Sequence, residues 1–329
     1  SSDLGEKLMK RKILFLIMLL TFVMSCGSKK NSDSSGNDLK DVGKFNYYAS
    51  VYNDMSEINA GISEYFREAG EAEKIKKSET VKNITVNEGT IEKLQKGISI
   101  NYKMENLDKV AKELLPVLKE LKIVTDDMNN YYSGKDYTSD NFAKAQELHT
   151  KFLAIIKKYE KLDNEFGAAL VVREKENFES SLNKYKKDNS LIKYNMLVLI
   201  NESKNFIGEM KTQNLNTANY TQGDLAKLKP IQQKIVETSN NLQKLIKDEK
   251  QLKKEKFRAE EFTTFQRSLA SYKASVASFI SRIERKHPAN PGEIKQPWMT
   301  ESTEGMPNNV LREYGNLVDD YNSIMGKSN

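Results

Sequence analysis

The chain has 329 residues, of which 38% are hydrophobic and 30% are charged. This composition is more polar than that of an average globular domain, and it suits helices that bury one stripe and expose wide solvated faces. The 52 Lys and Arg residues and the 46 Asp and Glu residues give a net charge of +6. These charges are spread along the chain without a block of one sign. Because nucleic-acid binding requires a basic patch, no nucleic-acid partner is expected.

The first 25 residues have the features of a signal peptide. A basic stretch from Lys10 to Lys12 follows a start at Met9, and an apolar run extends from Ile13 to Met24. That run has 12 residues, whereas a helix that spans a bilayer needs about 20. We therefore predict an exported protein with a signal peptide over residues 1–25.

The apolar run ends in Val23-Met24-Ser25-Cys26, which is typical of a bacterial lipobox. Cys26 is the only cysteine in the chain, so it cannot form an internal disulfide. We predict cleavage before Cys26, lipidation of its thiol with diacylglycerol and acyl chains such as palmitate, and attachment to a membrane by lipid. The alternative is an ordinary secretory signal with a chance cysteine. Residues 26–43, rich in Ser, Asn, Asp and Gly, are predicted to form a flexible tether.

After the tether, apolar residues recur three and four positions apart, which is the spacing of an amphipathic helix. Because each run ends at a linker, the stripes are expected to pack against one another within one chain. We predict an all-α domain over residues 44–329, an elongated antiparallel bundle of six or seven helices with coiled-coil-like seams. The seven runs cover residues 45–66, 107–131, 148–166, 178–210, 228–252, 262–283 and 311–325.

Two segments interrupt the helical pattern. Residues 71–102 are predicted to be irregular, with a short strand over 81–86 and a short helix near Ile91. Residues 286–308 contain four of the six prolines and the only tryptophan, Trp298, and are predicted to form a long loop. Pro116 predicts a kink or a helix boundary in the second run, and Gly167 is placed in a break between runs.

Five polar residues occupy positions in the apolar stripes. They are expected to fix the register of the helices or to face solvent, and lining a cavity is the less favoured alternative. They are Asn59, Asn189, Ser203, Thr238 and Glu249.

The sequence contains none of the common catalytic or nucleotide-binding motifs. The two histidines, His149 and His287, are far apart in the chain, and the single cysteine is assigned to lipidation. These residues supply neither a nucleophile–base pair nor a zinc site. We therefore predict no catalytic residue, no metal and no cofactor.

The segment from Tyr131 to Phe142 is the most distinctive in the chain, because three tyrosines crowd a turn between two helices. Such a corner is either an aromatic contact surface or a structural turn in which the rings pack and a polar side chain caps the next helix. The candidate binding residues are Tyr131, Tyr132, Tyr137 and Asp140 of this corner, His149 beyond it, and Trp298 of the proline-rich loop.

Together these features resemble the YiiG-like lipoproteins. The resemblance includes the lipobox, the segments Tyr47-Tyr48 and Val51-Tyr52-Asn53 of the first run, the corner from Tyr131 to His149, and Leu317 to Asn322 of the last run. It implies a helical lipoprotein of the bacterial cell envelope, and it implies no catalytic residue.

The favoured function is a non-enzymatic binding or scaffolding module that presents its surface to an envelope or host protein or a glycan. The mature domain is expected outside the cytoplasm, held to a membrane by its lipid. The alternative is a small-ligand carrier with a cavity between helices near the tyrosine corner. An enzyme ranks third, since it would need several carboxylates, or His149 with a carboxylate, to converge in one pocket.

Overall fold

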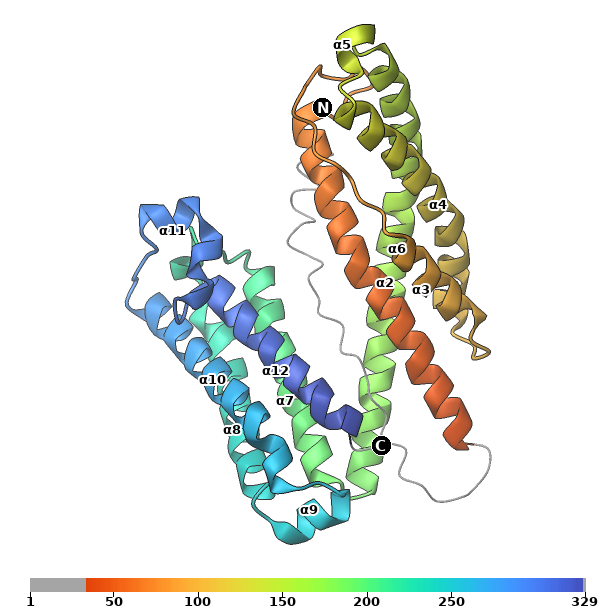
Figure 1. The fold of residues 1–329 in the computed structure, drawn as a ribbon. Helices are drawn as coiled ribbons and strands as arrows, with labels where there is room; N and C mark the ends of the chain where they lie inside the picture. The colour runs from red at the N-terminus through yellow and green to blue at the C-terminus, as the bar shows by residue number, and fades with distance from the viewer. Residues whose placement is uncertain (1–33, 328–329) are drawn as a thin grey trace. The chain divides into compact units, whose positions relative to one another are not determined.

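The computed structural model describes residues 34–327, and these residues form helices joined by turns and irregular segments, without a strand (Figure 1). The all-α prediction is confirmed, although the helical elements are more numerous than the predicted six or seven. Where one bundle domain was predicted, the contacts divide the chain into two compact units, with the boundary between Glu174 and Lys175. The predicted signal peptide and Cys26 lie outside the described residues.

The first unit packs three long helices and one short helix through large aromatic side chains. Tyr48 and Tyr52 both lie edge-on to Phe166, with ring centroids 5.7 and 6.3 Å apart. A Cβ added at Gly167 would lie 2.5 Å from the Tyr52 hydroxyl oxygen, so this glycine makes room for the ring. The helices are α2 (Ser34–Ala69), α3 (Glu88–Ser99), α4 (Glu105–Ser133), the single turn α5 (Tyr137–Asp140) and α6 (Ala143–Lys187), whose residues after Glu174 belong to the second unit.

Helix α2 begins at Ser34, so the prediction of a flexible tether up to residue 43 is wrong for its second half. Charged side chains hold this part of α2 in place. Asp41 forms an ion pair of 2.7 Å with Arg173 of α6. Lys44 is buried and forms an ion pair of 2.7 Å with Asp108 of α4. The composition of residues 26–43 predicted flexibility. It could not show that charged residues in this region form ion pairs with α4 and α6.

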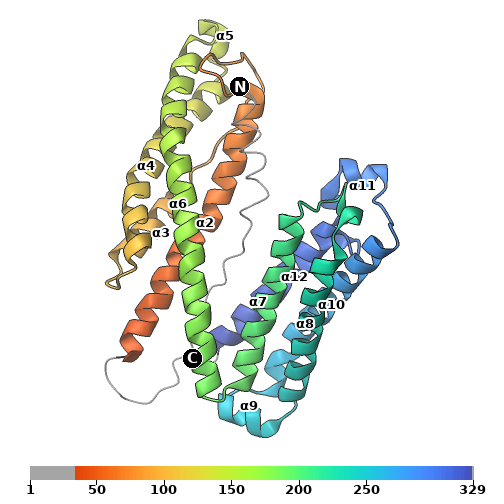
Figure 2. The ribbon, with the colours of Figure 1, turned by 180° about the vertical axis from the view of Figure 1, so that it is seen from behind.

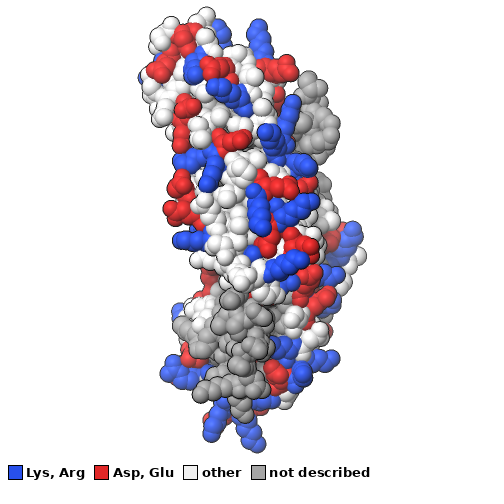
Figure 3. All heavy atoms as spheres, turned by 90° about the vertical axis from the view of Figure 1, so that its right-hand side faces the viewer, with Lys and Arg blue, Asp and Glu red and all other residues white. Residues whose placement is uncertain are grey.

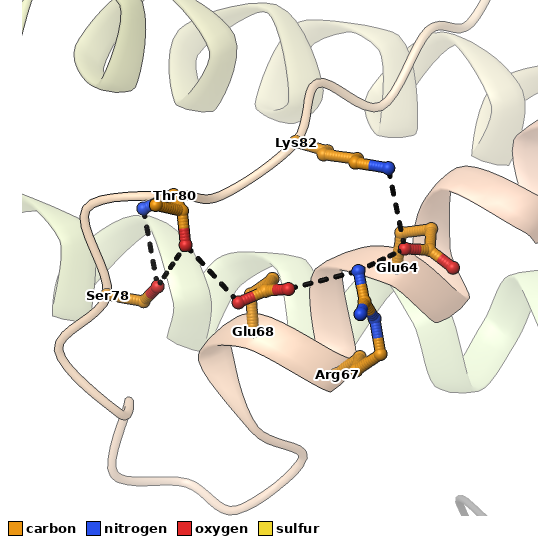
Figure 4. Close-up of polar contacts among 6 residues, drawn as sticks. All are labelled: Glu64, Arg67, Glu68, Ser78, Thr80 and Lys82. Carbon is orange, nitrogen blue, oxygen red and sulfur yellow. Dashed lines mark hydrogen bonds and ion pairs between the residues drawn. The ribbon is translucent and has the colours of Figure 1, made fainter.

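The segment between α2 and α3 is irregular, as predicted, but the strand predicted over residues 81–86 is absent from it. Its backbone bonds to side chains instead of to another strand. The Ile84 N–H donates to Asn129 Oδ1 at 3.1 Å, and Asn129 Nδ2 donates to the Ile84 carbonyl at 2.9 Å. Figure 4 shows that Thr80 and Lys82 also reach the carboxylates of α2. The short helix expected near Ile91 is α3.

The second unit pairs α7 with α8 and α10 with α12 (Figure 2). Its core includes Phe206, Tyr272 and Phe279. Phe206 meets Phe279 edge-on with ring centroids 6.1 Å apart. The elements are α7 (Leu191–Thr212), η1 (Tyr220–Gln222), α8 (Leu225–Leu245), α9 (Glu249–Glu255), η2 (Ala259–Phe262), α10 (Thr263–Glu284), α11 (Pro291–Lys295), η3 (Pro297–Ser302) and α12 (Pro307–Lys327).

The proline-rich segment 286–308 is more ordered than the predicted long loop. It contains the short helix α11 and the 3-10 helix η3, and each has a proline in its first turn. Pro307 is the first residue of α12, where the missing N–H has no intrahelical partner to lose. Proline therefore starts three helical elements here.

Several helices end on a non-glycine residue in the left-handed conformation. At each end, the N–H of the next residue bonds to the carbonyl five positions before it, as Ser190 does to Tyr185 at 2.8 Å and His287 to Arg282 at 2.9 Å. The left-handed residues are Lys135, Asn189, Asn214, Lys256 and Lys286, with φ between 51° and 61°.

These helix ends differ from the ones that the positions of glycine and proline in the sequence predicted. The break predicted at Gly167 is wrong, because α6 continues through it to Lys187. The single helix predicted over 178–210 is also wrong, because the chain turns at Asn189. Pro116 lies inside α4 and is not a helix boundary. Asn189 therefore has a clear role as a helix end, which its place in an apolar stripe concealed.

The face of the molecule in Figure 3 carries Lys and Arg side chains interleaved with Asp and Glu, without a large area of one sign. Several of these charges pair one helical turn apart, as Lys151 does with Glu147 at 2.7 Å. Such exposed pairs contribute little to stability, at most about 1 kcal/mol each. They keep the outer faces of the helices solvated.

The left-handed helix ends predict opposite effects of glycine at two nearby lysines. Lys256→Gly should raise the free energy of unfolding by about 0.5–1 kcal/mol, because glycine adopts positive φ without strain. Lys253→Gly, three residues earlier and inside α9, should lower it by about 1 kcal/mol. Urea unfolding followed by circular dichroism measures both. A loss of stability in Lys256→Gly would contradict this account of the helix end.

Candidate functional site

The predicted tyrosine corner joins α4 to α6 and is organised by Asp140. The Tyr131 hydroxyl donates to Asp140 Oδ1 at 2.7 Å. The same carboxylate accepts the N–H groups of Phe142 and Lys144, both at 2.9 Å, at the start of α6. The bond from Tyr131 lowers the pKa of Asp140 most, and the backbone N–H groups lower it further. Asp140 therefore acts as the cap of α6, as the structural interpretation of this corner requires.

The tyrosine rings fill the space inside the corner. Tyr137 stacks on Phe142 with ring centroids 5.1 Å apart, and Tyr131 meets Tyr132 edge-on at 5.3 Å. All three tyrosines are buried. The Tyr132 hydroxyl is enclosed without a hydrogen-bond partner among the described residues, which makes it the one polar atom here that the corner leaves unsatisfied.

His149 lies on α6 and is completely buried. Its Nε2 is 2.8 Å from the Ala72 carbonyl oxygen, and its Nδ1 is 2.8 Å from the Tyr65 hydroxyl. A carbonyl can only accept, so Nε2 carries the proton and Nδ1 accepts from Tyr65. Burial lowers the pKa of His149. The histidine is neutral in this arrangement and fastens the segment after α2 to α6.

Trp298 belongs to the second unit, whereas the tyrosine corner belongs to the first. It lies in η3 with 67% of its surface exposed. Ile294 of α11 and Met299 of η3 are 42% and 52% exposed, so this segment has three of the large apolar side chains that solvent reaches. We call Ile294, Trp298 and Met299 the apolar tip.

The tip is held by hydrogen bonds at its base. Thr300, which is fully buried, donates to the Pro297 carbonyl at 2.6 Å, and Asn308 donates to the same oxygen at 2.7 Å. Asn290 caps α11 by accepting the N–H groups of Gly292 and Glu293 at 2.9 and 3.0 Å. These bonds hold Trp298 on an ordered base.

The second unit also has two open hollows that sequence reasoning missed. The smaller, of about 270 Å³, we call the arginine hollow; its lining residues are Ser278, Ser281, Arg282, Arg285, His287 and Glu304. The larger, of about 420 Å³, is lined mainly by small side chains of α10 and by polar side chains of η3 and α12. Glu304 belongs to both hollows.

Gly305 follows Glu304, the residue that the two hollows share. It has φ of +76°, and a Cβ added there would lie 2.6 Å from the backbone carbon of Ser278. The chain can therefore cross α10 in contact with its backbone only because this residue has no side chain. The Ser278 hydroxyl donates to the Glu304 carboxylate at the crossing.

Within 34–327, no group of three or more His, Cys, Asp or Glu side chains could hold a metal ion. Over the same range, no helix is long and apolar enough to cross a membrane.

The fold and these features define an all-α protein with two helical units and a polar hollow on the second. Residues 40–323 match the family described as "Protein of unknown function (DUF3829)", and the chain belongs to this family. It is 23% identical over 250 residues to "Uncharacterized protein YiiG" of Escherichia coli strain K12. The match covers 73% of this chain and 65% of that relative. The expected YiiG-like resemblance is confirmed, and no solved structure matches the chain.

The burial of neutral His149 predicts a loss of stability in acid. Its folded-state pKa is below the ordinary value of 6.5, so the unfolded chain binds the proton more readily. The stability that neutral His149 provides is complete above pH 6.5 and decreases as the pH falls below that value. Between pH 7.5 and 5.5 the free energy of unfolding of the wild type should therefore fall more than that of His149→Gln, by on the order of 1 kcal/mol.

Urea unfolding of the two proteins at pH 7.5 and 5.5 measures this difference. His287→Gln removes the other histidine, whose side chain is exposed, and is the control variant measured beside it. An equal pH dependence in wild type and His149→Gln would show that His149 is not the titrating group.

Proposed function

We propose that this chain is an envelope lipoprotein, anchored by lipid at Cys26, whose helical units form a non-enzymatic binding module. The lipobox and the short apolar run before it support the anchor. The apolar tip is the observation that supports binding. A tryptophan that is 67% exposed on an ordered base resembles the aromatic anchors that contribute most to protein interfaces.

The order of the tip favours a protein partner with a preformed apolar pocket. Because Thr300 and Asn308 hold the Pro297 carbonyl, Trp298 loses little backbone freedom when it is bound. Ile294 and Met299 add apolar surface beside the indole ring. The partner we propose is an envelope or host protein that receives Trp298.

The surroundings of His149 support a non-enzymatic role. An enzyme built on this residue would need one imidazole nitrogen free to exchange a proton with a substrate. Both ring nitrogens are instead bonded to Tyr65 and to the Ala72 carbonyl. The histidine has no nitrogen left for a substrate.

If the protein is instead a small-ligand carrier, the tyrosine corner is a less favourable place for the ligand than the hollows beside α10. At the tyrosine corner a ligand would have to displace rings that already pack on each other, such as Tyr137 and Phe142. The open hollows beside α10 offer space without such a movement.

The lipid anchor can be tested by metabolic labelling. The wild-type protein should incorporate a palmitate analogue and remain with the membrane fraction. Cys26→Ser should lose the label and leave the membrane, because it has no thiol to acylate. Cys26→Ala is a second variant with the same expectation, and labelling of either variant would refute the anchor.

The apolar tip can be tested by site-specific photo-crosslinking in living cells. A photoreactive residue at position 298 should give an adduct with a defined protein, and Ile294→Ala with Met299→Ala should reduce its yield. The control position is Ile123 of α4, which is 63% exposed in the other unit. The proposal fails if position 298 gives no adduct, or if position 123 gives the same adduct.

A further inference from the structure

The arginine hollow has more positive than negative side chains. Arg282, Arg285 and His287 come from the end of α10 and the residues after it, and Glu304 is the one acidic residue in the lining. Within residues 34–327 neither arginine has a carboxylate within ion-pair distance. Two guanidinium groups therefore face one open space without a counter-charge paired to them.

Arg282 is held in position by neutral oxygens. Its Nε donates to the Glu304 carbonyl at 3.1 Å, and its Nη1 is 3.5 Å from the Tyr220 hydroxyl. Tyr220 is buried and donates to the His287 carbonyl at 2.6 Å, which links η1 to the end of α10. This arrangement leaves one Arg282 nitrogen, Nη2, without a hydrogen bond to a described residue. An anchored arginine needs little ordering when it binds a ligand.

The other groups in the hollow are hydrogen-bonding groups as well. The side chains of Ser281, Arg285 and His287 make no hydrogen bond to another described residue. Arginine presents its donors in a planar fork that matches the oxygens of a carboxylate or phosphate. The serine hydroxyl and the imidazole suit the hydroxyl groups of a sugar. An apolar ligand would meet few apolar side chains here.

We propose that the arginine hollow is a binding site for an anionic sugar, with its phosphate or carboxylate on Arg282 and Arg285. The volume of about 270 Å³ is enough for one sugar unit with its acidic group. Ser281 and His287 bind sugar hydroxyls. The Glu304 carboxylate accepts a hydrogen bond from Ser278, and its negative charge disfavours the anion. This site goes beyond the proposed contact at the apolar tip, and it can exist without that contact.

The same arginines have a second role that must be separated from binding. Cations in the last turn of a helix interact favourably with the helix dipole, so Arg282 and Arg285 also stabilise the end of α10. Loss of stability in a variant would not show that a ligand site was removed. Binding must therefore be measured at a temperature at which circular dichroism shows every variant to be fully folded.

The experiment is calorimetric titration of the full mature protein in detergent, at low salt, with four probes. Glucose 6-phosphate and glucuronate should bind, and the tighter of the two identifies the acidic group. Neutral glucose should not bind, and inorganic phosphate should bind at least about tenfold more weakly than glucose 6-phosphate. Arg285→Gln should weaken binding about tenfold or more, because it removes a charge-assisted hydrogen bond.

Arg267→Gln is the matched control, because Arg267 is exposed on the same helix about 27 Å from Arg285 along the axis. It should bind as the wild type does, and Glu304→Gln should bind at least as tightly. Trp298→Ala should also keep its affinity, which separates this site from the apolar tip. The proposal is overturned if neither anion binds, if glucose or phosphate binds as tightly as glucose 6-phosphate, or if Arg267→Gln loses as much affinity as Arg285→Gln.

Discussion

The structure of this chain depends on how its helices end. The last carbonyl groups of a helix need hydrogen-bond donors, and the chain must turn so that the next apolar stripe meets the previous one. At Asn189, one left-handed residue satisfies both needs, because it ends α6 and directs the chain into α7. At Lys286 the same turn ends α10 and places His287 beside two arginines. The fold and the arginine hollow therefore share one kind of local geometry.

The helical stripes could be predicted from sequence because burial alone selects them. Residues such as Phe206, Tyr272 and Val318 lie in the predicted runs and are buried. The helix boundaries could not be predicted in the same way. Gly167 looked like a break, but it is a helical residue that leaves room for the Tyr52 ring. The need for such room depends on a residue more than a hundred positions away.

The polar residues in the stripes show the same limit. Asn59 bonds across to Asp163 of α6 at 3.2 Å, which is a register contact between two helices. Ser203 donates to the Leu199 carbonyl of its own helix at 2.8 Å. Glu249 lies exposed in the first turn of α9. Register and solvent were the favoured alternatives, and they account for Asn59 and Glu249, whereas Ser203 is buried with a bond inside its own helix and Asn189 ends a helix.

The candidate site was predictable only in part. The crowding of Tyr131, Tyr132 and Tyr137 marked the corner, and the capping role of Asp140 was one of its two interpretations. The arginine hollow had no comparable signal. Ser278 and Glu304 are 26 residues apart, and they meet only because Gly305 lies directly on the backbone of α10. Sequence patterns describe the residues of one element, whereas a hollow is made by the approach of two.

The exposure of Trp298 has a consequence for spectroscopy of this protein. It is the only tryptophan in the chain, and 67% of its surface already meets water. Unfolding the core would therefore change its emission wavelength little, and tryptophan fluorescence would be a poor measure of stability. For the same reason, a shift of that emission toward shorter wavelengths would report the covering of this one side chain against an almost constant background.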